Sequence, residues 1–143
     1  MAHGTKTYLV CLLLFALSLV HTTIGICPQL SWDMRITNGL QSDALVVYPT
    51  DKDGADLGPH NLNPNEYFSW EFCEHATKSS HWYTLFYWQP HQQNYTVWDN
   101  KIGKECFRHY GAEECYWLVK EDGFFVSPDN DPFPKGWVKK YDW

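Results

Sequence analysis

Short runs of alternating hydrophobic and polar residues recur along this chain and predict β-strands. In Tyr67–Phe72, Phe68, Trp70 and Phe72 share one face, with polar side chains between them, which is the pattern of a half-buried strand. The same pattern predicts strands over Met34–Thr37, Ala44–Tyr48, Tyr67–Phe72, His81–Trp88, Tyr95–Trp98, Cys115–Lys120, Phe124–Val126 and Trp137–Trp143. No stretch of about eleven residues carries the i, i+3, i+4, i+7 spacing of an amphipathic helix, so no helix is predicted.

Turn residues between these strands predict some of their connections. Asn38-Gly39 is a hairpin-type turn signal after the first strand. Glu121-Asp122-Gly123 predicts a turn that pairs the strands on either side of it as a hairpin. Pro90 ends the His81–Trp88 strand, because proline has no N–H to donate. That strand is bulky on both faces, so we expect it to lie centrally in a sheet and to be covered on both sides.

The predicted fold class is an all-β, antiparallel two-sheet β-sandwich of seven to eight short strands. Two sheets packed face to face bury many alternating apolar side chains economically. Aromatic residues make up 17% of the chain, and their bulk favours pleated surfaces over helices. A closed barrel is the alternative, and the pattern separates the two poorly.

The first 25 residues resemble an export signal. Lys6 supplies positive charge, the run from Leu9 to Leu17 is apolar, and Thr23-Ile24-Gly25 offers small residues for cleavage after Gly25. The apolar run is short for a membrane span, although an uncleaved anchor is the alternative. We therefore expect residues 1–25 to be a secretory signal peptide and residues 26–143 to be one secreted domain. No second apolar stretch predicts a membrane span after cleavage.

Cysteine usage agrees with export. Four cysteines follow the signal segment: Cys27, Cys73, Cys106 and Cys115. An even number in an oxidising compartment predicts two disulfide bonds, and three pairings exist. Cys106 and Cys115 lie near each other along the chain, so we pair them, which leaves Cys27 with Cys73. A zinc site is disfavoured, because the sequence lacks a Cys-x-x-Cys pair.

The net negative charge of the chain argues against one class of function, nucleic-acid binding. The formal net charge is -6, from 11 Lys and Arg against 17 Asp and Glu. An acidic chain without a basic run cannot neutralise many phosphates, so we expect no nucleic-acid partner.

Several segments, in order, resemble the plant self-incompatibility S-protein homologue family. The resemblance is carried by Arg35–Leu40, Asp56–His60, Leu62–Phe72, Thr84–Phe86, Cys106 to Cys115, Trp117–Gly123 and Trp137–Trp143. It implies a small secreted β-sandwich without catalytic machinery. The founding members of that family are stigma-side ligands in the rejection of self pollen, and the roles of most other homologues are not settled.

One departure from the family concerns cysteines. The pairing of Cys106 with Cys115 matches the family. The family usually carries a further pair, at places that correspond here to Tyr48–Thr50 and to Tyr87 or Trp88, where this chain has no cysteine. We interpret the Cys27–Cys73 pair as a relocated bridge that replaces an inter-sheet one.

Two surface features are candidate sites. Asn94-Tyr95-Thr96 fits the acceptor pattern for N-glycosylation, next to an expected surface loop over Pro90–Gln93. The second feature is the acidic loop from Pro49 to Gly58, which carries Asp51, Lys52, Asp53 and Asp56. Calcium binding is disfavoured because the EF-hand spacing is not met, and we expect an acidic turn held open by its own charge repulsion. Because this loop varies in the family, it is the candidate partner-contact loop.

Other polar residues form no recognisable catalytic set. His75, His81, His91 and His109 are scattered, and no serine or cysteine nucleophile lies in a recognisable turn. We therefore predict no catalytic residue, no metal site and no cofactor. Glu113-Glu114 is expected to be a solvated charge pair.

The tryptophans allow two interpretations. Trp32, Trp82, Trp98 and Trp137 could form an exposed row that stacks on sugars, but burial in the core is the commoner use of such side chains. The function predicted is therefore a secreted, monomeric recognition ligand for a cell-surface receptor or another extracellular protein. A carbohydrate-binding module and a small hydrolase are the alternatives.

Overall fold

The computed structural model describes residues 27, 30–74, 79–108 and 113–143. The predicted signal peptide and its cleavage site lie outside the described residues. The elements in chain order are β1 (Leu30–Asn38), β2 (Leu45–Asp51), β3 (His60–Leu62), β4 (Tyr67–Glu74), β5 (Trp82–Trp88), β6 (His91–Trp98), α2 (Asn100–Cys106), β7 (Glu113–Lys120), β8 (Gly123–Ser127) and β9 (Val138–Tyr141).

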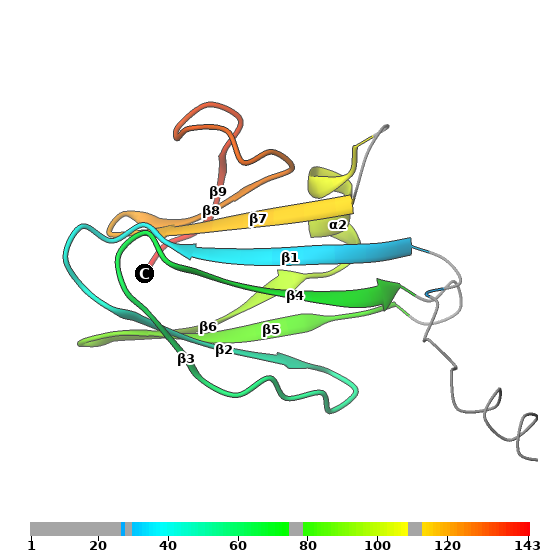
Figure 1. Ribbon diagram of the computed structural model, residues 1–143, viewed down its shortest axis with the longest axis horizontal. Coiled ribbons are helices and arrows are strands. Elements are labelled where there is room, and N and C mark those ends of the chain that lie inside the picture. The colour runs from blue at the N-terminus through cyan, green and yellow to red at the C-terminus, as the bar shows by residue number, and fades with distance from the viewer. Residues whose placement is uncertain (1–26, 28–29, 75–78, 109–112) are drawn as a thin grey trace, which may run out of the picture.

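These strands form two sheets that lie face to face, which confirms the predicted all-β sandwich (Figure 1). One sheet has five strands in the order β4-β1-β7-β8-β9, and the other has four in the order β3-β2-β5-β6. The pair β1–β7 is parallel and the other pairs are antiparallel. A parallel neighbour requires a long crossover, and here the chain passes through the four-stranded sheet between β1 and β7.

The core lies between the sheets and is built largely from aromatic rings. Trp32 faces Phe72 across the β1–β4 pair, and Met34 faces Trp70. Trp117 of β7 is fully buried and donates its indole N–H to the carbonyl oxygen of Val97 at 3.0 Å. That bond satisfies the polar atom that a buried tryptophan brings with it.

The hairpin predicted at Asn38-Gly39 is wrong, because β1 and β2 belong to different sheets. The Asn38 side chain is fully buried, and its amide nitrogen donates to the carbonyl oxygens of Asp43 and Leu62. Its Oδ1 accepts the N–H of Leu40 at 2.9 Å. Asn38 therefore links the end of β1 to the β1–β2 connection and to the end of β3, and the chain crosses between sheets at this point.

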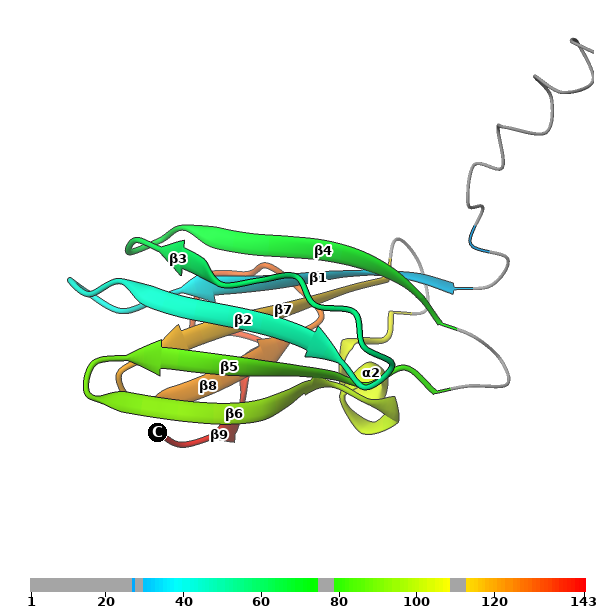
Figure 2. The same ribbon diagram turned by 90° about the horizontal axis from the view of Figure 1, so that it is seen from below.

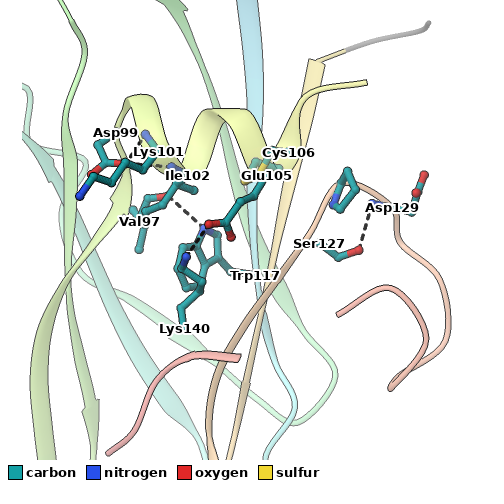
Figure 3. The surroundings of a disulfide bond; sticks show 12 residues. Val97, Asp99, Lys101, Ile102, Glu105, Cys106, Trp117, Ser127, Asp129 and Lys140 are labelled. Atoms are coloured by element: carbon teal, nitrogen blue, oxygen red, sulfur yellow. Dashed lines mark hydrogen bonds and ion pairs between the residues drawn. A yellow bond between two sulfur atoms is a disulfide. The ribbon is translucent and has the colours of Figure 1, made fainter. Parts of the chain in front are cut away.

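The prediction that the chain has no helix is also wrong. Residues Asn100–Cys106 form α2, whose first turn is capped by Asp99 (Figure 3). The Asp99 Oδ1 atom accepts the N–H groups of Lys101 and Ile102 at 2.9 and 2.8 Å, as an N-cap residue does. Seven residues are too few to fill the window from which an amphipathic helix is recognised, although Ile102 and Cys106 are buried one turn apart.

The strand β5 is internal to its sheet as predicted, but only one of its faces is covered. Trp82, Thr84 and Phe86 point into the core, whereas Tyr83 and Tyr87 on the outer face are 36% and 40% exposed. The outer face of a two-layer sandwich meets solvent, so bulky residues on both sides of a strand do not require two covering layers.

Both predicted cysteine pairs are disulfide-bonded in the structure. Cys27 lies before β1 and is bonded to Cys73 of β4, with Cα atoms 5.6 Å apart. Cys106 at the end of α2 is bonded to Cys115 of β7, with Cα atoms 5.1 Å apart. The two positions where the family carries its further pair lie on β2 and β5, which are neighbours in the four-stranded sheet. The further pair of the family would therefore join two strands of one sheet and not the two sheets. Cys73 lies on β4, in the other sheet, so the interpretation of Cys27–Cys73 as a relocated inter-sheet bridge is wrong.

Candidate partner-contact site

The acidic loop leaves the end of β2 and turns back on itself at once. The Oδ1 atom of Asp51 accepts the backbone N–H groups of Asp53 and Ala55, both at 2.8 Å. Gly54 has φ of 99°, a conformation that side chains larger than hydrogen rarely adopt. The expectation that charge repulsion holds the loop open is therefore wrong, because the Asp51 carboxylate closes the turn through the backbone.

The second half of the loop is held in the same way. Asp56 accepts the hydroxyl of Tyr48 through Oδ2 at 2.7 Å and the N–H of Gly58 through Oδ1 at 2.9 Å. The Tyr48 hydrogen bond, with help from Gly58, lowers the pKa of Asp56, and the same bond raises the pKa of Tyr48. Asp56 is thus a fixed, ionised group at neutral pH.

The loop presents a rigid acidic surface to solvent. Residues 52–56 are exposed, and the backbone N–H of Lys52 donates to the carbonyl oxygen of His81 at 3.1 Å. This contact anchors the loop to the start of β5. The loop and α2 lie at the same end of the sandwich (Figure 2). Within the described part of the chain, no group of three or more His, Cys, Asp or Glu side chains could hold a metal ion.

A cleft of about 420 Å³ lies beside α2. Its walls include Trp32, Trp98 and Phe107, with Lys104 and Glu74 among its charged residues. The indole N–H of Trp32 donates to Glu74 at 3.0 Å. The described walls offer apolar surface and one charge of each sign, and they contain no nucleophile paired with a base.

A row of three carboxylates crosses the outer face of the five-stranded sheet, and sequence reasoning missed it. Asp33 of β1 lies directly opposite Glu71 of β4 on one side and Glu114 of β7 on the other. Partial burial, with Glu71 and Glu114 alongside, raises the pKa of Asp33, although Arg35 opposes the shift. Alternation points these residues outward, but the sequence does not state which strands are neighbours.

Arg35 lies on the same face between two aromatic rings. Its guanidinium carbon is 4.4 Å from the ring centre of Tyr67 and 5.2 Å from that of Tyr116. Tyr67 is 54% exposed, whereas Tyr116 is buried. Tyrosine and arginine are over-represented in protein interfaces. The face therefore has a mixed polar and aromatic character beside the carboxylate row.

Glu113 and Glu114 are not a freely solvated pair. Both lie in β7 and are half-buried. Glu114 is 3.6 Å from Arg108, which also contacts Asp129 at 2.8 Å. One oxygen of Glu113 is buried and has no hydrogen-bond partner among the described residues.

The predicted glycosylation residue lies on a strand and not in a loop. Asn94 is exposed in the middle of β6, and the expected loop over Pro90–Gln93 instead forms the hairpin turn and the start of β6. The side chain is open to solvent in spite of this, because it points outward from the sheet.

The histidines are dispersed. His81 lies with its Nδ1 atom 3.3 Å from the carbonyl oxygen of Ser79. His91 packs against the rings of Trp88 and Trp143. His75 and His109 lie outside the described residues.

Most of the tryptophans belong to the core, as predicted. Trp32, Trp82 and Trp98 are at most 5% exposed, and only Trp137 of the four singled out is half-buried. Trp137 donates its indole N–H to the carbonyl oxygen of Asp131 at 2.8 Å. The exposed rings of the four-stranded sheet are tyrosines.

The fold and these surfaces define a disulfide-bonded β-sandwich with polar outer faces. No helix among the described residues is long and apolar enough to cross a membrane. The chain belongs to the plant self-incompatibility protein S1 family, whose model matches residues 33–143. Membership of this family supports the interpretation of the chain as a recognition-type protein.

Two Arabidopsis thaliana relatives are similar to the chain. It is 30% identical to S-protein homolog 1 over 109 residues and 29% identical to S-protein homolog 74 over 104 residues. Each match covers 71% of this chain and 66% of the relative, so the chain spans slightly less than two thirds of the length of these relatives.

Proposed function

We propose that this protein is exported after removal of residues 1–25 and acts as a monomeric extracellular recognition ligand, without catalysis. Membership of the self-incompatibility family and the two disulfide bonds support this proposal. The observation that carries it is the acidic loop, whose backbone is fixed by the Asp51 and Asp56 carboxylates and which exposes Asp53 and Asp56. A loop that is already ordered loses little conformational entropy on binding.

The partner is a cell-surface receptor or another extracellular protein with a basic patch that fits this loop. Removal of residues 1–25 takes away Lys6 and no acidic residue, so the net charge goes from -6 to -7 and steers such a patch towards the protein at long range. Fixed loop carboxylates then give specificity at contact.

The test removes the negative charge of two loop side chains and keeps the hydrogen bond that holds the loop backbone. In Asp53→Asn/Asp56→Asn, the amide oxygen at position 56 can still accept the Gly58 N–H. The matched control is Asp43→Asn/Asp122→Asn, which removes the same charge from the connections at the opposite end of the sandwich (Figure 1). Binding of each labelled, secreted variant to intact plant cells is measured.

We expect the loop variant to bind about tenfold or more weakly, which is about 1.4 kcal/mol, and the control to bind as the unaltered protein does. Equal binding by the loop variant and the control would contradict the proposed site.

A second candidate is a carbohydrate-binding module. It is favoured by exposed Tyr83 and Tyr87 and by a cavity of about 280 Å³ at one end of their face, lined in part by Asn61 and Gln89. If the protein is retained on a polysaccharide column and the Tyr83→Ser/Tyr87→Ser variant is not, the result would support the carbohydrate-binding module over the recognition ligand. The small hydrolase is a third class, and turnover of a substrate panel would support it.

A further inference from the structure

The outer face of the four-stranded sheet carries no charged side chain at its strand positions. The register aligns three rows across β2, β5 and β6. The rows are Thr50–Tyr83–Thr96, Tyr48–Leu85–Asn94 and Val46–Tyr87–Gln92. The Asp56 carboxylate of the acidic loop meets this face at Tyr48. The strand positions themselves are neutral and partly aromatic, unlike those of the carboxylate-bearing face of the other sheet.

Two rings on this face have no covering layer. Tyr83 and Tyr87 are 36% and 40% exposed, and Leu85 between them is half-buried. Their aromatic surface and hydroxyl groups suit a ligand that offers both C–H groups and hydroxyls, which describes a sugar.

Asn94 lies on the same face, midway along the edge strand β6. It is directly opposite Leu85 in the register, and Tyr83 and Tyr87 are its two diagonal neighbours. Diagonal neighbours across an antiparallel pair are about 7–8 Å apart. The first sugars of a chain attached to Asn94 therefore reach both rings without any change in the backbone.

The strand β6 lies at the edge of its sheet, which is a second reason to expect that something covers this part of the surface. Residues His91–Trp98 include no Lys, Arg, Asp, Glu or Pro, and β6 is the last strand of its sheet. A long neutral edge strand is prone to pair with another chain. Part of the edge is occupied, because Tyr141 donates its hydroxyl to the carbonyl oxygen of Thr96 at 3.0 Å.

We propose that an N-linked glycan on Asn94 lies over this face, with its first sugars stacked on Tyr83 and Tyr87. It covers Tyr83, Tyr87 and the β6 edge. The acidic loop joins β2 to β3 on the other side of the sheet, so the loop and the five-stranded sheet remain free to meet the partner. The inference rests on the proposed export, because the glycan is attached in the secretory pathway.

The attachment is a group transfer to the side-chain amide. A bond forms between Nδ2 of Asn94 and the anomeric carbon of an oligosaccharide carried on a lipid diphosphate. The bond from that carbon to the diphosphate oxygen breaks, and the amide loses one proton as the lipid diphosphate leaves. Once attached, the glycan is held at high effective concentration beside the rings and excludes free sugars or a second copy of the chain.

The test compares two substitutions at one position on secreted protein. Thr96→Ala removes the acceptor pattern and keeps Asn94, whereas Thr96→Ser keeps the pattern and is the matched control. Intact mass first establishes which variants carry a glycan. Hydroxyl-radical footprinting then measures the oxidation rate of Tyr83 and Tyr87, with Tyr67 on the other sheet, 54% exposed, as the internal reference.

We expect Thr96→Ala to oxidise at Tyr83 and Tyr87 about twofold faster than Thr96→Ser, as for rings that lose a stacked cover, with Tyr67 unchanged. We also expect Thr96→Ala alone to self-associate in sedimentation. Equal rates in the two variants, with the glycan present in Thr96→Ser, would overturn the stacking. A Thr96→Ser protein without glycan mass would overturn this inference at its first step and leave the loop-binding test of the proposed function intact.

Discussion

Single buried polar residues organise the connections of this sandwich. The clearest is Asn38, whose side chain bonds three backbone groups, two in the β1–β2 connection and one at the end of β3. The dipeptide Asn38-Gly39 suggested a hairpin by its composition, but its asparagine instead satisfies carbonyl and amide groups where the chain changes sheets. Local turn chemistry cannot reveal this role, because the partners are set by the tertiary fold.

Replacing Asn38 therefore affects stability strongly. We expect Asn38→Ala to lower the free energy of unfolding by about 3 kcal/mol, since it leaves buried backbone groups unpaired. Chemical denaturation measures the change, with Asn61→Ala on the exposed side of β3 as a control that should stay within about 0.5 kcal/mol. A loss below the control's range would show that Asn38 is not the hub of these connections.

Replacing Asp33 is expected to raise the free energy of unfolding, whereas replacing Asn38 lowers it. Burial and its like-charged neighbours raise its pKa, so the folded state holds the proton more tightly than the unfolded state. The favourable contribution of the protonated form is complete below the unfolded pKa and is lost as pH rises through the folded pKa. At neutral pH the ionised Asp33 is therefore destabilising.

We expect Asp33→Asn to raise the free energy of unfolding at pH 7 by about 0.5 kcal/mol, the size of a like-charge pair across strands, and to give no gain once the pH is below the Asp33 pKa. Added salt should shrink the gain. Thermal unfolding between pH 3 and pH 7 checks this, with Asp122→Asn as the charge control. A gain that is the same at both ends of that range would contradict the assignment.

Whole elements were predictable wherever hydrophobic alternation is long enough. The eight predicted strands overlap β1, β2, β4, β5, β6, β7, β8 and β9. The three residues of β3 and the seven of α2 are too short for any periodicity to emerge. Their conformations are instead fixed by pairing with β2 and by the Asp99 cap together with Cys106.

The disulfide bond between Cys106 of α2 and Cys115 of β7 is expected to stabilise the fold by joining these two elements. Cys106→Ser/Cys115→Ser should lower the free energy of unfolding by about 2–3 kcal/mol, since the closed loop is short. Peptide mapping with and without reductant should find Cys106 linked to Cys115 and Cys27 linked to Cys73. A free thiol at any of these four positions would contradict the pairing.

At the scale of the whole molecule, the sequence indicated the fold class and an acidic loop but not how the two outer faces differ. Alternation states that Asp33, Glu71 and Tyr83 point outward, but not which strands are adjacent. The strand order places carboxylates in a row on one sheet and neutral side chains around Asn94 on the other. This division of the surface gives each face its own role in the account.

Site-specific photo-crosslinking on intact plant cells tests most directly whether the acidic loop, and not the neutral face, meets the partner. A photoreactive residue is placed at position 53 in the acidic loop or at position 83 on the neutral face, and each secreted protein is irradiated on the cells. We expect a discrete covalent adduct with a cell-surface protein from position 53 and none from position 83. An adduct from position 83 alone, or from neither position, would contradict it.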